Sequence, residues 1–192
     1  MKKISKNKIT AVILAGGQAS RMDGEDKGLI VFRELPLISH VINITKPKVS
    51  QILISANRNF EEYANFGKVI SDDLEGYQGP LAGISKALKV CSTPYLLVLP
   101  CDSPLIDAAL IDSLIEKMEI SNVDICVAHD GSIMHATFAL MQTKLEKSLE
   151  EFLGEGGRKM ALWYRQQSLE RIDVSSHLEV LTNINRPEDF NL

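Results

Sequence analysis

The chain has 192 residues, a formal net charge of −4 and a hydrophobic content of 45%, which suits one domain with a core of its own. This charge gives no indication of nonspecific DNA or RNA binding. No apolar run approaches the roughly 18 residues of a membrane span, and residues 1–8 are expected to be a flexible tail rather than a signal peptide. Three widely spaced cysteines indicate neither a disulfide scaffold nor a zinc site, so we expect a cytoplasmic location.

Short apolar runs alternate with helical patterns in the first part of the chain. The segments expected to be strands are 9–15, 51–56, 68–71 and 95–100. Their Val, Ile and Leu content without clean alternation is typical of strands buried on both faces. The segments expected to be helices are 36–45, 59–65, 80–90 and 107–118. Pro36 and Pro80 stand at first helical positions, and Asp107 is a candidate N-cap. The pattern predicts a mostly parallel sheet with helices on both faces.

The remainder of the chain is less regular. Further strands are expected at 124–128, 136–141 and 169–174, with a turn signal at Asp130-Gly131. Further helices are expected at 144–153, 159–167 and 187–190. Open α/β sheets bind ligands beyond the carboxyl ends of their strands. Three segments occupy such positions: the loop after the first strand, Asp72-Asp73 after the third, and Pro100-Cys101-Asp102 after the fourth.

The loop after the first strand has the residue types of a phosphate-binding loop. Gly16 and Gly17 allow close approach of the backbone to a ligand, and successive N–H groups in such a turn can hold an anion. Arg21 and Lys27 add cations for phosphate oxygens. The loop is neither a Walker motif nor a dinucleotide fingerprint, because Gly28 follows the lysine and the first two glycines are adjacent. We therefore expect it to bind phosphate, with both cations as catalytic candidates.

Asp102 ends an apolar strand opposite that loop. A carboxylate in this position can hold Mg²⁺, which often takes one or two carboxylates plus substrate phosphates. A turn or cap is the alternative, because Ser103-Pro104 follows. Cys101 is expected to be a small packed residue, since no histidine partner for a nucleophile is evident.

Asp72-Asp73, after the third expected strand, is a second acidic segment at the same edge of the predicted sheet. One of these carboxylates could accept hydrogen bonds from guanine, which carries two adjacent donors; a solvated loop is the alternative. Gly79 and Pro80 follow, and there a helix N-terminus can approach a ligand, or simply pack tightly.

The signals near the C-terminus are weaker. Arg158 and Lys159 could bind a second phosphate or face water, and Asn183 and Asn185 could contact a polar heterocycle or cap local backbone. No acid–base pair or nucleophilic triad stands out. The combination instead favours phosphoryl chemistry in which positioning and charge stabilisation supply the catalysis.

Four segments together carry a family resemblance: LAGGQASRMDGEDKG, DDLEGYQGPLAGI, LPCDSPL and TNINRPEDF. In this order and spacing the chain resembles the molybdenum cofactor guanylyltransferases, the MobA family, over residues 9–189. The resemblance implies a single nucleotidyltransferase domain, residues 1–192, with a three-layer Rossmann-like α/β fold and a mostly parallel mixed sheet. It implies transfer of GMP from GTP to the terminal phosphate of molybdenum-bound molybdopterin, with Mg²⁺ and release of pyrophosphate.

The resemblance also implies roles for individual residues. Leu14, Ala15 and Gly16 match the backbone segment that meets the nucleotide. Lys27 matches the loop lysine, Asp72 a nucleotide-binding acid and Asp102 the metal-binding acid. Asn183 and Asn185 match an N-x-N segment on the pterin side, where we also place Arg158 and Lys159. The expected partners are GTP, molybdenum-molybdopterin, and proteins that deliver the pterin or insert the product. We expect a monomer.

Two positions depart from the family pattern. Asp23 stands where the family usually has glycine, although Asp tolerates left-handed backbone better than most residues. Ser55 stands where related sequences often have Asn, which puts a base or ribose contact there in doubt. Asn57 lies close enough in sequence to share that contact.

Two other functions remain open. Another nucleotidyltransferase of this fold could make a cytidine form of the cofactor or an activated sugar, although the loop LAGG favours the guanylyl branch over LAAG. A non-catalytic GTP-binding module would be expected to carry a Walker lysine and an N-K-x-D base motif. Both are missing from the sequence.

Overall fold

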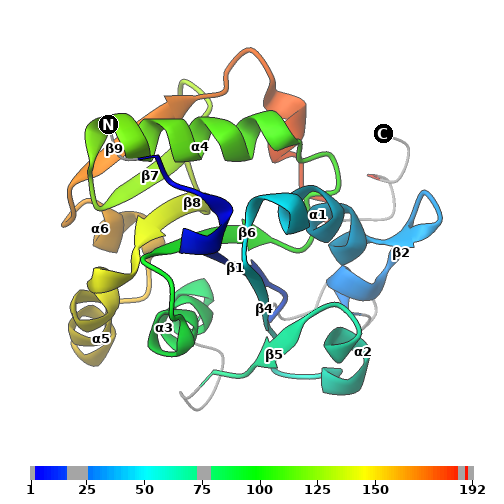
Figure 1. Ribbon diagram of the computed structural model, residues 1–192. Helices are drawn as coiled ribbons and strands as arrows, with labels where there is room; N and C mark the ends of the chain where they lie inside the picture. Colours follow the sequence, from blue (N-terminus) through cyan, green and yellow to red (C-terminus); the bar gives the residue numbers. More distant parts are fainter. Residues whose placement is uncertain (1–2, 17–25, 73–78, 186–188, 190–192) are drawn as a thin grey trace.

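The computed structural model describes residues 3–16, 26–72, 79–185 and 189. Within this part, seven strands form one sheet in the order β5-β4-β1-β6-β8-β7-β9 (Figure 1). They are β1 (Ile9–Leu14), β4 (Gln51–Ser55), β5 (Lys68–Ile70), β6 (Tyr95–Pro100), β7 (Ile125–His129), β8 (Met134–Gln142) and β9 (Leu169–Asp173). β8 runs antiparallel to both of its neighbours, whereas the other neighbouring pairs are parallel. The predicted mostly parallel, mixed sheet is confirmed.

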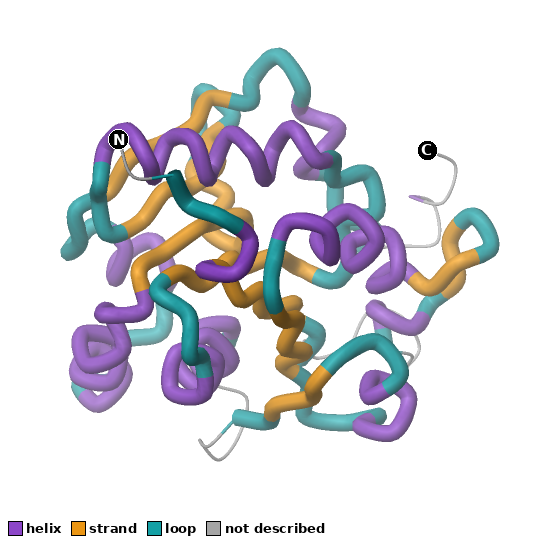
Figure 2. The backbone as a smooth tube through the Cα atoms, viewed as in Figure 1, coloured by secondary structure: helices purple, strands orange, loops and turns teal. Residues whose placement is uncertain are grey.

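Helices cover both faces of the sheet (Figure 2). They are α1 (Leu37–Thr45), α2 (Phe60–Ala64), α3 (Pro80–Val90), α4 (Ala108–Ser121), α5 (Glu146–Gly154) and α6 (Met160–Tyr164). Buried residues of α1 and α4 share one core cluster, and those of α3, α5 and α6 share another. The fold is therefore a three-layer α/β sandwich. No helix among the described residues is long and apolar enough to cross a membrane.

The two cores arise from the alternation of side chains along each strand. In β1, Ala11 and Ile13 belong to the core under α1 and α4, while Val12 belongs to the core over α3. These three side chains are fully buried, because successive residues of a strand point to opposite faces of the sheet. Fully burying a Val or Ile side chain contributes about 1.5–3 kcal/mol. Because both faces of this central strand are buried, its residues are mostly apolar and do not alternate with polar ones.

Most element boundaries agree with the predictions to within a few residues. Asp107 is confirmed as a cap, because its side chain accepts a hydrogen bond from the N–H of Leu110. α6 ends at Tyr164, earlier than expected. The predicted closing helix at 187–190 lies almost entirely outside the described residues.

Two features near the start of the chain differ from the predictions. Ile4 is buried in the core and a 3₁₀ turn, η1 (Lys6–Lys8), follows it, so residues 3–8 do not form the expected flexible tail. A two-stranded hairpin, β2 (Val31–Phe32) and β3 (Leu35–Pro36), precedes α1, which begins at Leu37 rather than at Pro36. The turn residues Arg33 and Glu34 both have positive φ, typical of a tight hairpin turn. The hairpin could not be predicted from the sequence, because arginine and glutamate rarely adopt this conformation.

Candidate active site

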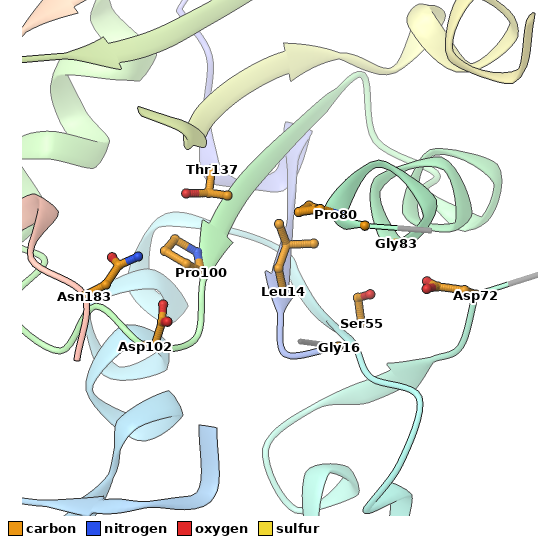
Figure 3. Close-up of a pocket in the computed structure, with 11 residues that line it drawn as sticks. Leu14, Gly16, Ser55, Asp72, Pro80, Gly83, Pro100, Asp102, Thr137 and Asn183 are labelled. Carbon is orange, nitrogen blue, oxygen red and sulfur yellow. The ribbon is translucent and has the colours of Figure 1, made fainter. Parts of the chain in front are cut away.

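A cavity of about 180 Å³ opens at the carboxyl ends of the central parallel strands, as expected for an open α/β sheet. Its walls come from β1, β4, the loops after β5 and β6, the start of α3, and β8 (Figure 3). The residues that line it are Leu14, Gly16, Ser55, Asp72, Gly79, Pro80, Gly83, Pro100, Asp102, Thr137 and Asn183. The fold thus gathers one binding site from segments spread over most of the chain.

The start of α3 lies against the end of β4. A Cβ atom on Gly83 would stand 2.1 Å from the hydroxyl oxygen of Ser55, so only glycine fits between this helix and the strand. Gly79 precedes the helix with φ of +76°, a conformation that favours glycine. The N-terminus of α3, the positive end of the helix dipole, is therefore held at the cavity wall, where it favours an anion or a polar ligand.

Asp72 is oriented by Asn57. The Asn57 amide nitrogen donates to Asp72 Oδ2 over 2.8 Å, and the Asp72 backbone N–H donates to the Asn57 side-chain oxygen over 3.1 Å. The second carboxylate oxygen, Oδ1, is buried and has no hydrogen-bond partner among the described residues. A buried acceptor without a partner is costly, and Asp72 lines the cavity close to Gly83 of α3.

Lys27 lies between two polar groups. Its Nζ is 3.3 Å from Asp102 Oδ2 and also donates to the Asn185 side-chain oxygen. Burial raises the pKa of Asp102, and the nearby Lys27 ammonium partly offsets this effect. The structure therefore brings the predicted loop lysine and the predicted metal-binding acid together, although they are 75 positions apart in the sequence.

A buried carboxylate holds the chain beside Lys27. Asp26 is 6% exposed and accepts hydrogen bonds from Tyr63 Oη, Arg58 Nε and Asn59 Nδ2. Burial raises the pKa of the Tyr63 phenol, which keeps its proton available for donation. The short helical turn η2 (Lys27–Leu29) begins immediately after this carboxylate. Asp26 thus fixes the backbone from which Lys27 extends, a role that the sequence motifs did not reveal.

Among the residues that the structure describes, Asp102 is the cavity-lining carboxylate that pairs with Lys27. Among the described residues there is no group of three or more His, Cys, Asp or Glu side chains arranged to hold an ion. This donor set fits Mg²⁺, which frequently binds one protein carboxylate and takes its other ligands from phosphates and water. Cys101 supplies no nucleophile, because burial raises the pKa of its thiol well above the usual range.

Of the other predicted residues, two lie outside the described part of the chain, one lies beside the cavity and two lie away from it. Gly17 and Arg21 lie outside the described residues. Ala15 is buried beside the cavity, and its N–H donates to the Ser55 carbonyl over 2.8 Å. Arg158 donates to the carbonyls of Leu153 and Gly157 at the end of α5, so its side chain caps a helix. Neither Arg158 nor Lys159 lines the cavity.

The structure also adds residues that the motifs did not single out. Thr137 lines the cavity from β8, although nothing in its sequence context distinguishes it from an ordinary strand threonine. Ser103 donates to the Asn183 side-chain oxygen over 2.6 Å and so orients that amide. Thr137 and the Ser103–Asn183 pair reach the cavity from segments that are remote in the sequence. The spacing of residues within a motif could therefore not have identified them.

A three-layer α/β fold with a glycine-flanked cavity, a lysine and a carboxylate at one sheet edge is the arrangement expected of a nucleotidyltransferase. Residues 11–171 match the family model of the MobA-like NTP transferase domain. The chain belongs to this family and is a nucleotidyltransferase.

Curated relatives agree with this assignment. The chain is 44% identical over 181 residues to the molybdenum cofactor guanylyltransferase of Shewanella sediminis (strain HAW-EB3), covering 94% of this chain and 92% of the relative. It is 43% identical to the protein of the same name from Shewanella putrefaciens (strain CN-32 / ATCC BAA-453), covering 94% and 93%.

Solved structures share the fold at low sequence identity. Molybdopterin-guanine dinucleotide biosynthesis protein A from Archaeoglobus fulgidus superposes with a TM-score of 0.78 at 20% identity, covering 95% of each chain. The 4-diphosphocytidyl-2C-methyl-D-erythritol synthase from Anaerococcus prevotii DSM 20548 gives 0.72 at 11% identity, covering 97% of this chain and 96% of the other. The fold therefore does not by itself decide which base is used.

Proposed function

We propose that this enzyme transfers GMP from GTP to the terminal phosphate of molybdenum-bound molybdopterin, giving the guanine dinucleotide form of the cofactor and pyrophosphate. The observation that carries the choice of base is the buried Oδ1 of Asp72 in the cavity wall, which has no hydrogen-bond partner within residues 3–16, 26–72 and 79–185. Guanine presents adjacent N1–H and amino donors, of which Oδ1 can accept one or both. The names of the curated relatives support the same base.

The geometry supports a division of the cavity into a nucleoside end and a phosphate end. Asp72, Ser55 and Gly83 form one end, next to the start of α3, while Asp102 lies at the other (Figure 3). Lys27 lies beside Asp102 at 3.3 Å. With guanine on Asp72, the α-phosphate of GTP is expected to lie near Lys27 and Asp102.

The reaction is an exchange of phosphoanhydride partners. An oxygen of the acceptor phosphate forms a new bond to the α-phosphorus of GTP, and the bond between that phosphorus and the bridging oxygen to the β-phosphate breaks. Pyrophosphate leaves with the electron pair of the broken bond. Lys27 stabilises the negative charge that develops on the α-phosphate, and the walls of the cavity hold the two substrates in line.

Asp102 is the residue that would hold Mg²⁺. When bound, Mg²⁺ neutralises phosphate charge and orients the triphosphate. The ammonium of Lys27 lies 3.3 Å from one oxygen of the Asp102 carboxylate and partly compensates the charge of this largely buried group.

The cellular setting is part of the proposal. Cys91, Cys101 and Cys126 are all free thiols, which suits the reducing cytoplasm. The acceptor is expected to come from a protein that makes or carries molybdopterin, and the product to pass to proteins that insert it.

The decisive experiment is nucleotide transfer to molybdenum-loaded molybdopterin, comparing GTP, ATP, CTP and UTP, with pyrophosphate measured as a second product. We expect GTP to be strongly preferred and pyrophosphate to form in equal amount to the dinucleotide. Equal use of GTP and CTP would contradict guanylyl transfer and favour the cytidylyl branch. Nucleotide binding without pyrophosphate release would favour a GTP-binding module.

A further inference from the structure

The wall of the cavity that contains Thr137 is formed by an irregular part of β8. Val127 of β7 pairs with Ala139 of β8, but the next residue of β7, Ala128, pairs with His135. Residues 136–138 of β8 therefore bulge out of the regular pairing. The pairing of β8 with β6 ends at Val98–Ala139, so the bulge lies where β6 continues toward the cavity paired with β1 only. Bulges beside active sites commonly aim a side chain at the ligand.

The bulge is held in place by groups on each side of Thr137. Tyr164 is fully buried, and its hydroxyl donates to the Ala136 carbonyl over 2.9 Å. His135, also before Thr137, has its Nε2 2.8 Å from Asp130 Oδ2. The His135 ring packs edge-on against the buried ring of Phe138, the residue after Thr137. The backbone around Thr137 is thus fixed at both flanks, which pre-organises its side chain for binding.

Thr137 faces the cavity together with Asn183. Asn183 accepts from Ser103 through its side-chain oxygen at 2.6 Å, which leaves its amide nitrogen on the side of Pro100 (Figure 3). The wall formed by Thr137, Pro100 and Asn183 therefore offers a hydroxyl and an amide N–H₂ group. Asp102 lies beside this wall, and Asp72 lies across the cavity from it (Figure 3).

In the proposed binding mode the nucleotide does not occupy this wall, so the wall is open to the second substrate. Guanine takes the Asp72 end, and the triphosphate takes the side of Gly16, Lys27 and Asp102. An acceptor phosphate must reach the α-phosphorus from the side opposite the leaving pyrophosphate. Neutral donors suit a phosphate that acts as nucleophile, because they orient its oxygens without neutralising their charge.

Resting on the proposed function, we propose that Thr137, with Asn183 beside it, binds the terminal phosphate of the acceptor. The Thr137 hydroxyl donates to a phosphate-monoester oxygen, and the bulge held by Tyr164 sets the position of that hydroxyl. Thr137 is then a substrate-binding residue for the acceptor, and Tyr164 is a positioning residue that acts through it.

The test is steady-state transfer with molybdenum-loaded molybdopterin as the varied substrate, in Thr137→Val and Thr137→Ser. Valine keeps the shape and β-branching of threonine and removes only the hydroxyl, whereas serine keeps the hydroxyl. We expect Thr137→Val to raise the KM for molybdopterin by about three- to tenfold, the range of one uncharged hydrogen bond, with the KM for GTP unchanged. Thr137→Ser should retain the KM for molybdopterin to within about twofold.

Tyr164→Phe adds a second readout, because it frees the Ala136 carbonyl while keeping the buried ring. It should raise the KM for molybdopterin, again without changing that for GTP, and should have little further effect when combined with Thr137→Val. An unchanged molybdopterin KM in Thr137→Val, or a rise in the GTP KM instead, would overturn the subsite. These outcomes are distinct from failure of the proposed function, which would show in the unmutated enzyme as no GMP transfer or no preference for GTP.

Discussion

Asn57 and Asp72 are joined by two hydrogen bonds that run in opposite directions, one between the side chains and one from the Asp72 backbone to the Asn57 side chain. This pairing uses the amide group of Asn57 and leaves Asp72 Oδ1 without a partner in the part of the chain that the structure describes. Under the proposed function, we therefore expect Asn57 to act on the nucleotide by orienting Asp72, rather than through the base or ribose contact that its position in the sequence suggested.

The first prediction concerns base selection. An acceptor left unpaired by the wrong base costs roughly 1–3 kcal/mol, so two such contacts give discrimination on the order of 10²–10⁴ in kcat/KM. Asp72→Ala should lose much of the preference for GTP over CTP, while still binding the triphosphate. Asn57→Ala should lose less of it, because the carboxylate remains but is no longer oriented. The measurement is kcat/KM for both nucleotides. Strong preference in Asp72→Ala would show that backbone groups recognise the base.

The second prediction concerns Lys27. Loss of one transition-state charge contact typically costs about 10²–10³ in turnover, so Lys27→Ala should lower kcat by this factor at saturating GTP. Lys46→Ala, which alters an exposed lysine after α1, is the matched control and should be unaffected. Near-normal kcat in Lys27→Ala would remove this residue from the catalytic groups.

The third prediction concerns the metal. Asp102→Asn keeps the shape of the side chain but removes its charge, so the concentration of Mg²⁺ required for half-maximal transfer should rise, with partial recovery at high Mg²⁺. Asp112→Asn alters a surface aspartate paired with Lys48 and should leave the metal dependence unchanged. A superimposable Mg²⁺ titration for Asp102→Asn would show that the ion is held elsewhere.

The fourth prediction concerns the backbone turn that carries Lys27, η2 (Lys27–Leu29). A Cβ atom on Gly28 would stand 2.5 Å from Tyr63 Oη, the hydroxyl that donates to Asp26. Gly28→Ala should therefore lower stability by about 1–3 kcal/mol, as overpacking usually does, and should lower kcat because the turn carrying Lys27 moves.

Gly154→Ala is the control for that change. A Cβ there meets nothing within 4 Å, and Gly154 is the last residue of α5, so stability should be unchanged or slightly raised. The measurements are urea unfolding and kcat for both variants. Equal behaviour of the two alanine variants would refute the proposed contact between Gly28 and Tyr63.

The fifth prediction is a pH dependence. Hydrogen bonds from the Ile133 backbone, His135 and the Ser132 backbone hold the pKa of Asp130 far below its usual range. A carboxylate whose pKa is lowered by folding stabilises the protein above its unfolded pKa of about 3.9 and loses that contribution as pH falls. The difference in unfolding free energy between the wild type and Asp130→Ala should therefore be largest above about pH 4 and shrink at lower pH. Urea titrations at several pH values measure it, and a constant difference would contradict the assignment.

The sequence was sufficient for those features that depend on local pattern. Unbroken apolar runs indicated strands buried on both faces, and the helical segments between them indicated parallel pairing, because a parallel connection must cross over the sheet. Asp107 was recognisable as a cap from its position before an apolar helix. The glycine-rich segment, Asp72 and Asp102 were placed at one sheet edge by the same rule, since each follows a parallel strand.

Only the tertiary structure decided how those residues are used. The Asp26–Tyr63 contact, the Asn57–Asp72 pairing and the fit of Gly83 against Ser55 depend on distances of a few ångströms between separate elements. The bulge that brings Thr137 to the cavity depends on the pairing of β8 with β7. Motifs state which residue types are present and in what order, whereas hydrogen bonding and close packing depend on where the assembled layers bring their side chains. The identity of the family could thus be predicted from the sequence, while the division of labour within the site required the folded chain.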